Sequence, residues 1–107
     1  MLYTYNAVVT DVYDGDSVTL LVDLGFEVRF RIKVRLSGIN TPEIRGSSRP
    51  EGLIARDYLR DLILNKIVIF KSLRDKKGKY GRYLGVIYID GFNVNKKLLD
   101  LGLAEEY

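Results

Sequence analysis

An unbroken alternation of apolar and charged residues runs from residue 26 to residue 36, and it constrains the fold more than any other feature. Phenylalanine, valine, isoleucine and leucine fill the even positions, whereas glutamate, arginine and lysine fill the odd positions. Side chains alternate between the two faces of a strand, so the pattern predicts a long strand with one face on the core. Such a strand belongs in a curved meander or a barrel.

Four further strands and two helices are predicted. Residues 7–13 and 18–22 are rich in β-branched residues and end at turn formers, and residues 67–70 and 83–89 give the fourth and fifth strands. A helix is predicted from residue 50 to about residue 65, because Pro50 and Glu51 suit a first helical turn and apolar residues then recur at helical spacing. A short final helix ends at Gly102.

Three strands, a helix, two strands and a final helix fit a five-stranded Greek-key β-barrel, the OB-fold. The predicted class is therefore mainly β with α (α+β), with one helix between strands three and four and a short C-terminal helix. A small α+β sandwich fits the same order of elements. A chain of 107 residues buries one core, so residues 1–107 are expected to form a single domain.

Composition excludes several kinds of chemistry. The chain has no cysteine and no histidine, which excludes disulfides, thiolate metal sites and catalysis by imidazole. The net charge of +3 is too mild to identify a polyanionic partner by itself. No apolar run is long enough for a membrane span, and the first five residues lack the pattern of a secretory signal. We expect no membrane partner. We also expect a cytoplasmic location if the chain is expressed as given, and the sequence predicts no other compartment.

Two acidic turns are candidates for chemistry. Asp14 and Asp16 flank a glycine after the first strand, a pattern that indicates a tight turn more often than a metal site. Residues 40–43 read Asn-Thr-Pro-Glu, and Pro42 keeps Thr41 extended, so that turn is stiff. Neither turn identifies a site alone, but carboxylate and amide oxygens together suit a hard cation.

Basic residues accompany these turns. Arg35 lies on the charged face of the long strand, where four of the five charged residues are basic, which favours an anion-facing surface over neutral ion pairing. Residues 74–82 add lysines and arginines beside Tyr80. Ammonium groups next to an aromatic ring suit a nucleotide, although a charge run is more often a solvated loop.

Five motifs occur in a fixed order: Asp-Gly-Asp-Ser, Arg-Leu-x-Gly-Ile-Asn-Thr-Pro-Glu, Pro-Glu-Gly, Lys-Tyr-Gly-Arg, and Asp-Gly-x-x-Val-Asn followed by Gly-Leu-Ala. In this order, over residues 7–104, they resemble the staphylococcal nuclease (thermonuclease) family. The resemblance implies an OB-fold and a Ca²⁺-dependent phosphodiesterase that acts on DNA and RNA and leaves 3′-phosphates. The implied partner is DNA or RNA, preferably single-stranded, and the protein is expected to be a monomer.

The resemblance also implies roles for single residues. Asp16 and Asn40 match side-chain ligands of the calcium ion, Thr41 matches a carbonyl ligand, and Asp14 matches an acid just outside the ligand set. Glu43 matches the residue that positions or deprotonates the attacking water.

The remaining matches concern the nucleotide. Arg35 and Arg82 match the guanidinium pair on the phosphate. Lys79 and Tyr80 match positions that contact the bound nucleotide, and Tyr107 is matched to a nucleotide-stacking tyrosine.

Asn40 departs from the family, which has an aspartate at this position. An amide oxygen still ligates calcium, but the site loses one negative charge and weaker metal binding is expected. Two hypotheses follow: a working nuclease with a looser metal requirement, or an OB-fold module that binds nucleic acid with reduced or lost catalysis. Arg35, Glu43 and Arg82 together favour the first. A protein-interaction module is a third hypothesis and would require an exposed apolar patch.

Overall fold

The computed structural model describes residues 3–73 and 82–107. The strands are β1 (Tyr3–Asp14), β2 (Ser17–Asp23), β3 (Arg29–Leu36), β4 (Ile39–Asn40), β5 (Ile67–Ser72), β6 (Tyr83–Ile89), β7 (Phe92–Asn93) and β8 (Glu105–Glu106). The helices are the short 3₁₀ helix η1 (Gly46–Ser48), α1 (Arg49–Ile63) and α2 (Val94–Asp100).

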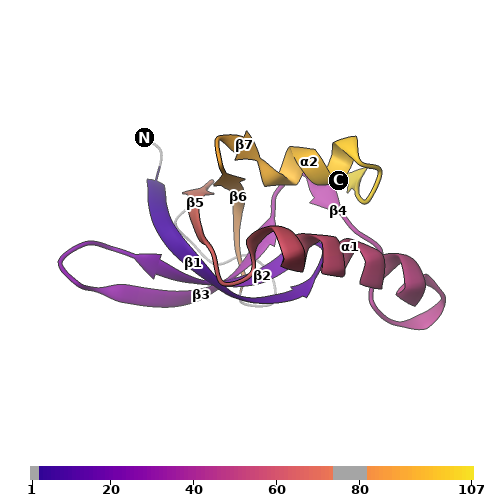
Figure 1. Ribbon diagram of the computed structural model, residues 1–107, viewed down its shortest axis with the longest axis horizontal. Helices are drawn as coiled ribbons and strands as arrows, with labels where there is room; N and C mark the ends of the chain where they lie inside the picture. The colour runs from indigo at the N-terminus through magenta and orange to yellow at the C-terminus, as the bar shows by residue number, and fades with distance from the viewer. Residues whose placement is uncertain (1–2, 74–81) are drawn as a thin grey trace.

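Five strands form a closed barrel. Antiparallel pairs join β3 to β2, β2 to β1, β1 to β5 and β5 to β6, and a parallel pair between β3 and β6 closes the ring. The helix α1 connects the first three strands to the last two, and α2 follows the barrel (Figure 1). The predicted OB-fold of the α+β class is therefore confirmed.

Apolar side chains from every barrel strand and both helices fill one core. Its fully buried members include Val9, Leu20, Leu36, Leu59, Ile63, Phe70, Ile87 and Leu98. Helix α1 lies against β1 and buries Ala55, Leu59 and Ile63 on that side. Burial of each large apolar side chain stabilises the fold by about 1.5–3 kcal/mol. The core therefore fixes the strands from which the polar turns of the site extend.

The long strand differs from its prediction. The alternation begins at residue 26, but β3 begins at Arg29, and Phe26 and Glu27 form the tip of the β2–β3 hairpin with positive φ angles of 54° and 62°. Figure 1 shows this hairpin projecting beyond the barrel. Phe30 is half exposed, whereas Val34 and Leu36 are buried, because only the C-terminal half of β3 covers the core.

Three short strands, β4, β7 and β8, were not predicted. The strand β8 pairs with β4, with Glu105 opposite Asn40. This small sheet brings the last residues of the chain beside the turn that follows β3, which matters for the site described below.

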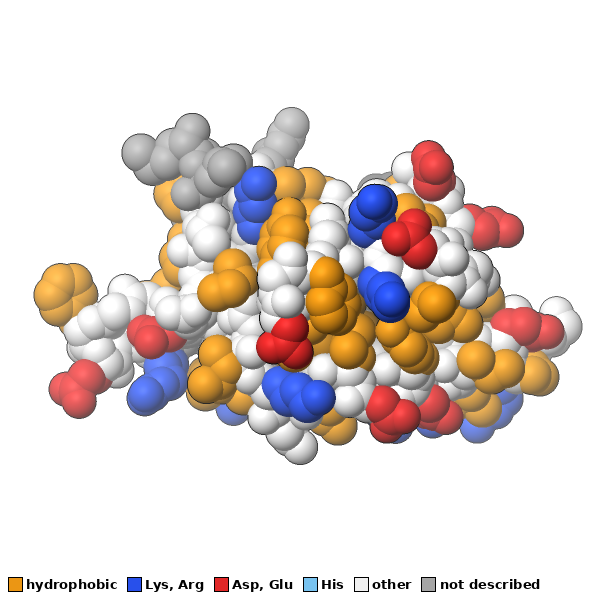
Figure 2. Space-filling model, turned by 45° about the horizontal axis from the view of Figure 1, so that its top comes forward, with side chains coloured by type: hydrophobic (Ala, Val, Ile, Leu, Met, Phe, Trp, Pro, Cys, Tyr) orange, Lys and Arg blue, Asp and Glu red, His pale blue; other side chains and the backbone are white. Residues whose placement is uncertain are grey.

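The surface carries charge of both signs. On the face drawn in Figure 2, acidic and basic side chains are interspersed with apolar ones, in keeping with the mild net charge of +3. Among the described residues, no helix is long and apolar enough to span a membrane.

Candidate active site

The turn between β1 and β2 is built around a glycine. The backbone N–H of Asp16 donates to Asp14 Oδ1 over 3.1 Å, a local bond that favours a turn. A Cβ atom on Gly15 would lie 2.8 Å from the Thr41 side chain and 2.9 Å from that of Ala55. The turn therefore presses directly on the predicted metal-binding loop and on α1, and only glycine fits there.

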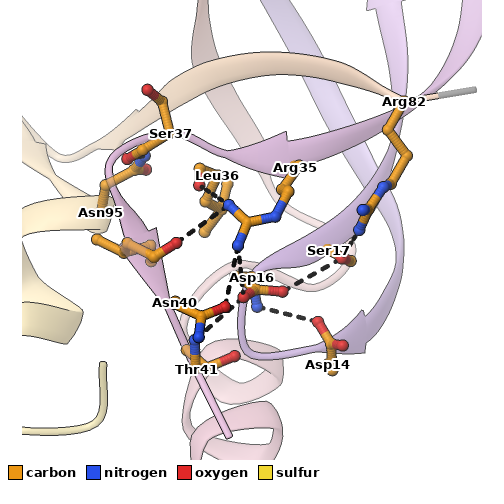
Figure 3. A network of polar contacts seen from close by, with 11 residues as sticks. Asp14, Asp16, Ser17, Arg35, Leu36, Ser37, Asn40, Thr41, Arg82 and Asn95 are labelled. Atoms are coloured by element: carbon orange, nitrogen blue, oxygen red, sulfur yellow. Dashed lines mark hydrogen bonds and ion pairs between the residues drawn. The ribbon is translucent and has the colours of Figure 1, made fainter. Parts of the chain in front are cut away.

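Asp16 is the centre of a buried polar network (Figure 3). Its Oδ2 accepts from the backbone N–H of Thr41 over 3.0 Å and lies 3.5 Å from Arg35 Nη2. Its Oδ1 accepts from the Ser17 hydroxyl over 3.3 Å. Asp16 thus ties β2 to β3 and to the loop after β4, as a buried carboxylate must be paired and hydrogen-bonded.

Arg35 is held by four acceptors. Its Nη1 donates to the carbonyl oxygens of Leu36 and Ile39, and its Nη2 donates to Asn40 Oδ1 over 3.1 Å and faces Asp16. The two Nη groups carry four of the five N–H donors of a guanidinium group; three of these four hydrogens are donated within the protein, and Nη2 also forms an ion pair with Asp16. Arg35 reaches a phosphate with both Nη groups only if some of these bonds are exchanged.

Tyr107 covers the same guanidinium group. The Cζ atom of Arg35 lies 4.7 Å from the centre of the Tyr107 ring, a cation–π distance. The backbone N–H of Tyr107 donates to the Gly38 carbonyl over 3.1 Å, which extends the β4–β8 contact. The ring is 85% exposed, so much of it remains accessible while Arg35 sits beside it.

Arg82 approaches from the barrel-closing strand. It precedes β6, and its Nη1 donates to the Ser17 hydroxyl over 2.7 Å. Figure 3 shows Arg35 and Arg82 pointing into the same region, with Asp16 and Ser17 between them. Two guanidinium groups are thereby directed at one place by strands that are distant in sequence.

Glu43 has an exposed side chain on a fixed backbone. Its carbonyl accepts from the Ser48 hydroxyl over 3.1 Å, and a Cβ atom on Gly52 would lie 2.2 Å from that carbonyl oxygen. The close packing of α1 against the loop explains the glycine of the Pro-Glu-Gly motif. Glu43, Asp14 and Arg82 line one cleft of about 600 Å³ together with Ser17.

Asp14 has a raised pKa. Burial is the largest cause, followed by a side-chain hydrogen bond with Asp16 and repulsion by Asp16. These effects outweigh the hydrogen bond from the Asp16 backbone N–H, which lowers the pKa, and raise the pKa of Asp14 from 3.8 to about 6. The fold thus makes Asp14 easier to protonate than a solvent-exposed aspartate.

The donor set fits a hard cation of limited affinity. Asp16 Oδ2 and Asn40 Oδ1 both lie within 3.5 Å of Arg35 Nη2, so two hard oxygen donors already converge on one positive group. The described residues hold no cluster of three acidic, histidine or cysteine side chains that would bind a metal. The calcium site, with Thr41 as carbonyl ligand, stays a prediction.

Most of the predicted site residues come together. Asp14, Asp16, Arg35, Asn40 and Thr41 form one network, which Arg82 joins through Ser17 and Tyr107 joins through its ring. Glu43 shares the cleft with Asp14 and Arg82. Lys79 and Tyr80 lie outside the described residues.

Sequence reasoning missed two residues. Ser17 links Asp16 to Arg82, and its place in the Asp-Gly-Asp-Ser motif was the available signal. Asn95 on α2 is buried and donates to the carbonyl oxygens of Ser37 and Gly85, so it anchors the end of β3 to β6. Its place in the Asp-Gly-x-x-Val-Asn motif was its signal.

Several known proteins are similar in sequence to this chain. Residues 33–107 match the family model described as staphylococcal nuclease homologue. The chain is 32% identical to an uncharacterized protein of Methanocaldococcus jannaschii over 96% of its own length and 59% of the relative's. It is 33% identical to an uncharacterized endonuclease of Haemophilus influenzae, covering 92% of this chain and 51% of that protein.

A third relative is the thermonuclease of Staphylococcus intermedius, 32% identical over 87% of this chain and 54% of that protein. The chain thus spans only about half to three fifths of the length of these relatives. The family match covers well over half of the chain and includes Arg35, Glu43 and Arg82, whereas β1 and β2 precede it. The chain therefore belongs to the staphylococcal nuclease family.

Proposed function

We propose that this chain is a nuclease that hydrolyses phosphodiester bonds of DNA or RNA with calcium, by attack of water on phosphorus, leaving 3′-phosphates. The observation that carries this proposal is that Arg35 contacts Asp16 and Arg82 contacts the adjacent Ser17. Ser17 and Arg82 line a cleft together with Glu43. Two guanidinium groups beside an exposed carboxylate suit a reaction in which an anion is attacked by water.

Each residue has a distinct task in this mechanism. Glu43 is exposed in the cleft and acts as the general base that takes a proton from water. Arg82 and Arg35 offset the charge that grows on the phosphate oxygens in the transition state. The water oxygen bonds to phosphorus as the bond between phosphorus and the 5′-oxygen breaks. The departing oxygen takes a proton from solvent and leaves as a 5′-hydroxyl.

Asp16, Asn40 and the Thr41 carbonyl are the residues that would hold calcium. The ion would supply positive charge beside the phosphate without strong acidification of water. It would compete with Arg35 Nη2 for the oxygens of Asp16 and Asn40, which lie 3.5 and 3.1 Å from that atom. Arg35 would then be released to donate to a phosphate, so metal and substrate binding favour one another.

A second candidate function is nucleic-acid binding with reduced or lost cleavage. Two observations favour it: Asn40 brings no charge to the site, and the Nη groups of Arg35 already form three hydrogen bonds and an ion pair inside the protein. Glu43 argues for hydrolysis, because binding an anion gains nothing from an exposed carboxylate in the cleft.

Digestion of end-labelled single-stranded DNA and RNA separates the two functions. The purified chain is incubated with millimolar-scale calcium, or with a chelator, and the products are resolved beside markers with 3′-phosphate ends. The nuclease proposal expects cleavage only with calcium, and products that a 3′-phosphatase shifts on the gel. Intact but retarded nucleic acid would instead establish the binding module. Intact nucleic acid that is not retarded would contradict both functions.

A further inference from the structure

Four basic residues form a row along one face of β3. Arg29, Arg31, Lys33 and Arg35 occupy alternate positions and therefore share a face. We call them the basic row. Alternate residues of a strand lie about 6.8 Å apart, so the row is about 20 Å long.

The basic row starts in the candidate active site. Arg35 is opposite Ser17 in the β2–β3 register, and Arg29 is opposite Asp23 at the projecting end of the hairpin. Lys33 lines the same cleft as Glu43 and Arg82. A strand that occupies the cleft beside Arg82 and Lys33 and follows β3 outwards therefore meets Arg31 and Arg29 in turn.

The outer part of the basic row is available to a ligand. Arg29, Arg31 and Lys33 are exposed, and within residues 3–73 and 82–107 none of them forms an ion pair. Arg31 Nη1 donates to the Thr10 hydroxyl over 3.2 Å, which orients that guanidinium group along β1.

The acids near the basic row do not cancel its charge. Asp23 is opposite Arg29 in the register, but its Oδ1 accepts from the backbone N–H of Gly25 over 2.8 Å. Asp11 lines the cleft near Lys33. Four basic side chains beside these two acids leave the row with an excess of positive charge.

We infer that the basic row binds successive phosphates of a single nucleic-acid strand that leaves the cleft along β3. Its regular spacing and its continuity with the cleft suit the backbone of an extended strand, which carries one charge per nucleotide. The inference rests on the proposed function for the nature of the ligand. It adds that the enzyme's footprint extends well past the cleaved bond, and that long strands bind better than short ones.

Binding of oligothymidylates of three and twelve nucleotides to the Glu43→Gln variant, with calcium present, tests this inference. Affinities are measured by fluorescence anisotropy at several salt concentrations. The added double change Arg29→Gln/Arg31→Gln removes two exposed charges from the row. The matched control, Lys96→Gln/Lys97→Gln, removes two exposed charges from α2. Circular dichroism verifies that both variants fold.

For the twelve-nucleotide strand, the row variant should lower the slope of log affinity against log salt by about 1.4, because each single-strand phosphate contact contributes about 0.7. In the row variant, the ratio of the affinity for the twelve-nucleotide strand to that for the three-nucleotide strand should also fall. The α2 control should change neither the slope nor this ratio. An unchanged slope, an equal loss in the control, or equal displacement by polyglutamate of the same length would overturn the inference.

Cleavage by the unmutated chain is measured separately. If the row variant behaves as expected but the unmutated chain cleaves nothing, the basic row stands and the nuclease proposal fails. If the unmutated chain cleaves but the slope is unchanged, only the basic row is wrong.

Discussion

The two ends of β3 hold their basic side chains in opposite ways. At the cleft, Arg35 is partly buried, faces four acceptors and lies beside Tyr107. At the hairpin, Arg29 and its neighbour Arg31 are exposed and form no ion pair within the described part of the chain. One strand thus carries a fixed guanidinium group at one end and unpaired charges at the other.

This difference separates two requirements of a nuclease. Hydrogen bonds to charged groups contribute about 1.5–3 kcal/mol each, so the cleft end is ordered before any substrate arrives, as chemistry at one phosphorus atom requires. Affinity for a variable polymer needs charge but little fixed geometry. Changes at the cleft end should therefore alter catalysis, and changes at the hairpin end should alter binding or local stability.

The largest expected effect is at Glu43. Glu43→Gln should lower turnover by about 10²–10⁴-fold, the usual contribution of a general base, and leave nucleic-acid affinity almost unchanged. Single-turnover cleavage and anisotropy binding measure the two quantities. Glu51→Gln removes an exposed charge from the first turn of α1 and is the matched control. A loss of less than tenfold would show that another group accepts the proton.

Gly52→Ala should damage the cleft through its support. The new Cβ atom would lie 2.2 Å from the Glu43 carbonyl oxygen and 2.8 Å from that of Pro42, and backbone cannot yield as a side chain can. Overpacking costs about 1–3 kcal/mol, more than the gain of up to about 1 kcal/mol from alanine in a helix.

Urea unfolding and cleavage rates of Gly52→Ala test this expectation, and both should fall. Ile54→Ala, on the exposed side of the same helix, should change neither by much. A stabilised Gly52→Ala would mean that helix propensity outweighs the contact with the Glu43 loop.

Asn40→Asp should tighten the metal site. The new carboxylate adds a full charge where Arg35 Nη2 now lies 3.1 Å from an amide oxygen, and ligand charge controls calcium affinity. The calcium concentration for half-maximal cleavage should fall by about tenfold, which is about 1.4 kcal/mol. Calorimetric titration with calcium gives a readout that does not depend on activity. Equal affinities in the two proteins would show that position 40 does not face the cation.

Asp14→Asn should change the pH dependence of stability at the cleft end. The folded-state pKa of Asp14 is raised to about 6, so its protonated form stabilises the fold below pH 4 and this contribution is lost as the pH rises through 6. Asparagine keeps the acceptor for the Asp16 N–H and stays neutral. Urea midpoints with a chelator from pH 4 to 7 should therefore show the variant gaining on the unmutated chain, and parallel curves would contradict the assignment.

How far the sequence predicted this molecule depended on the range of the interactions involved. The order of strands and helices was predictable because alternation and helical spacing are local. Asp16, Arg35 and Asn40 were named as site residues because the chain resembles a family to which it does belong. Their roles remain predictions.

Contacts formed between distant segments were not predictable. Pairing of β8 with β4 places Tyr107 against Arg35, and no local pattern in the last residues indicates that strand. The hairpin tip was also missed, because Phe26 continues the alternation although its backbone has left the sheet. The apolar pattern indicates which residues can face a core. The protruding end of the hairpin lies beyond the core, so its apolar residues stay exposed.

The smallest expected effect lies at that hairpin tip and tests whether the two ends of β3 are independent. Phe26 is 99% exposed with a φ of 54°, a left-handed conformation that costs most side chains about 1–2 kcal/mol and that asparagine tolerates better. Since no apolar surface is uncovered, Phe26→Asn should raise stability by several tenths of a kcal/mol, roughly the lower part of that cost.

The matched control is Phe30→Asn, which replaces a half-buried ring beside the core and should lose stability. Urea midpoints measure both changes, and cleavage of a three-nucleotide substrate should be the same in Phe26→Asn as in the unmutated chain. A change in that cleavage would mean that the hairpin tip and the cleft act together, and the division of β3 into an ordered end and an accessible end would have to be abandoned.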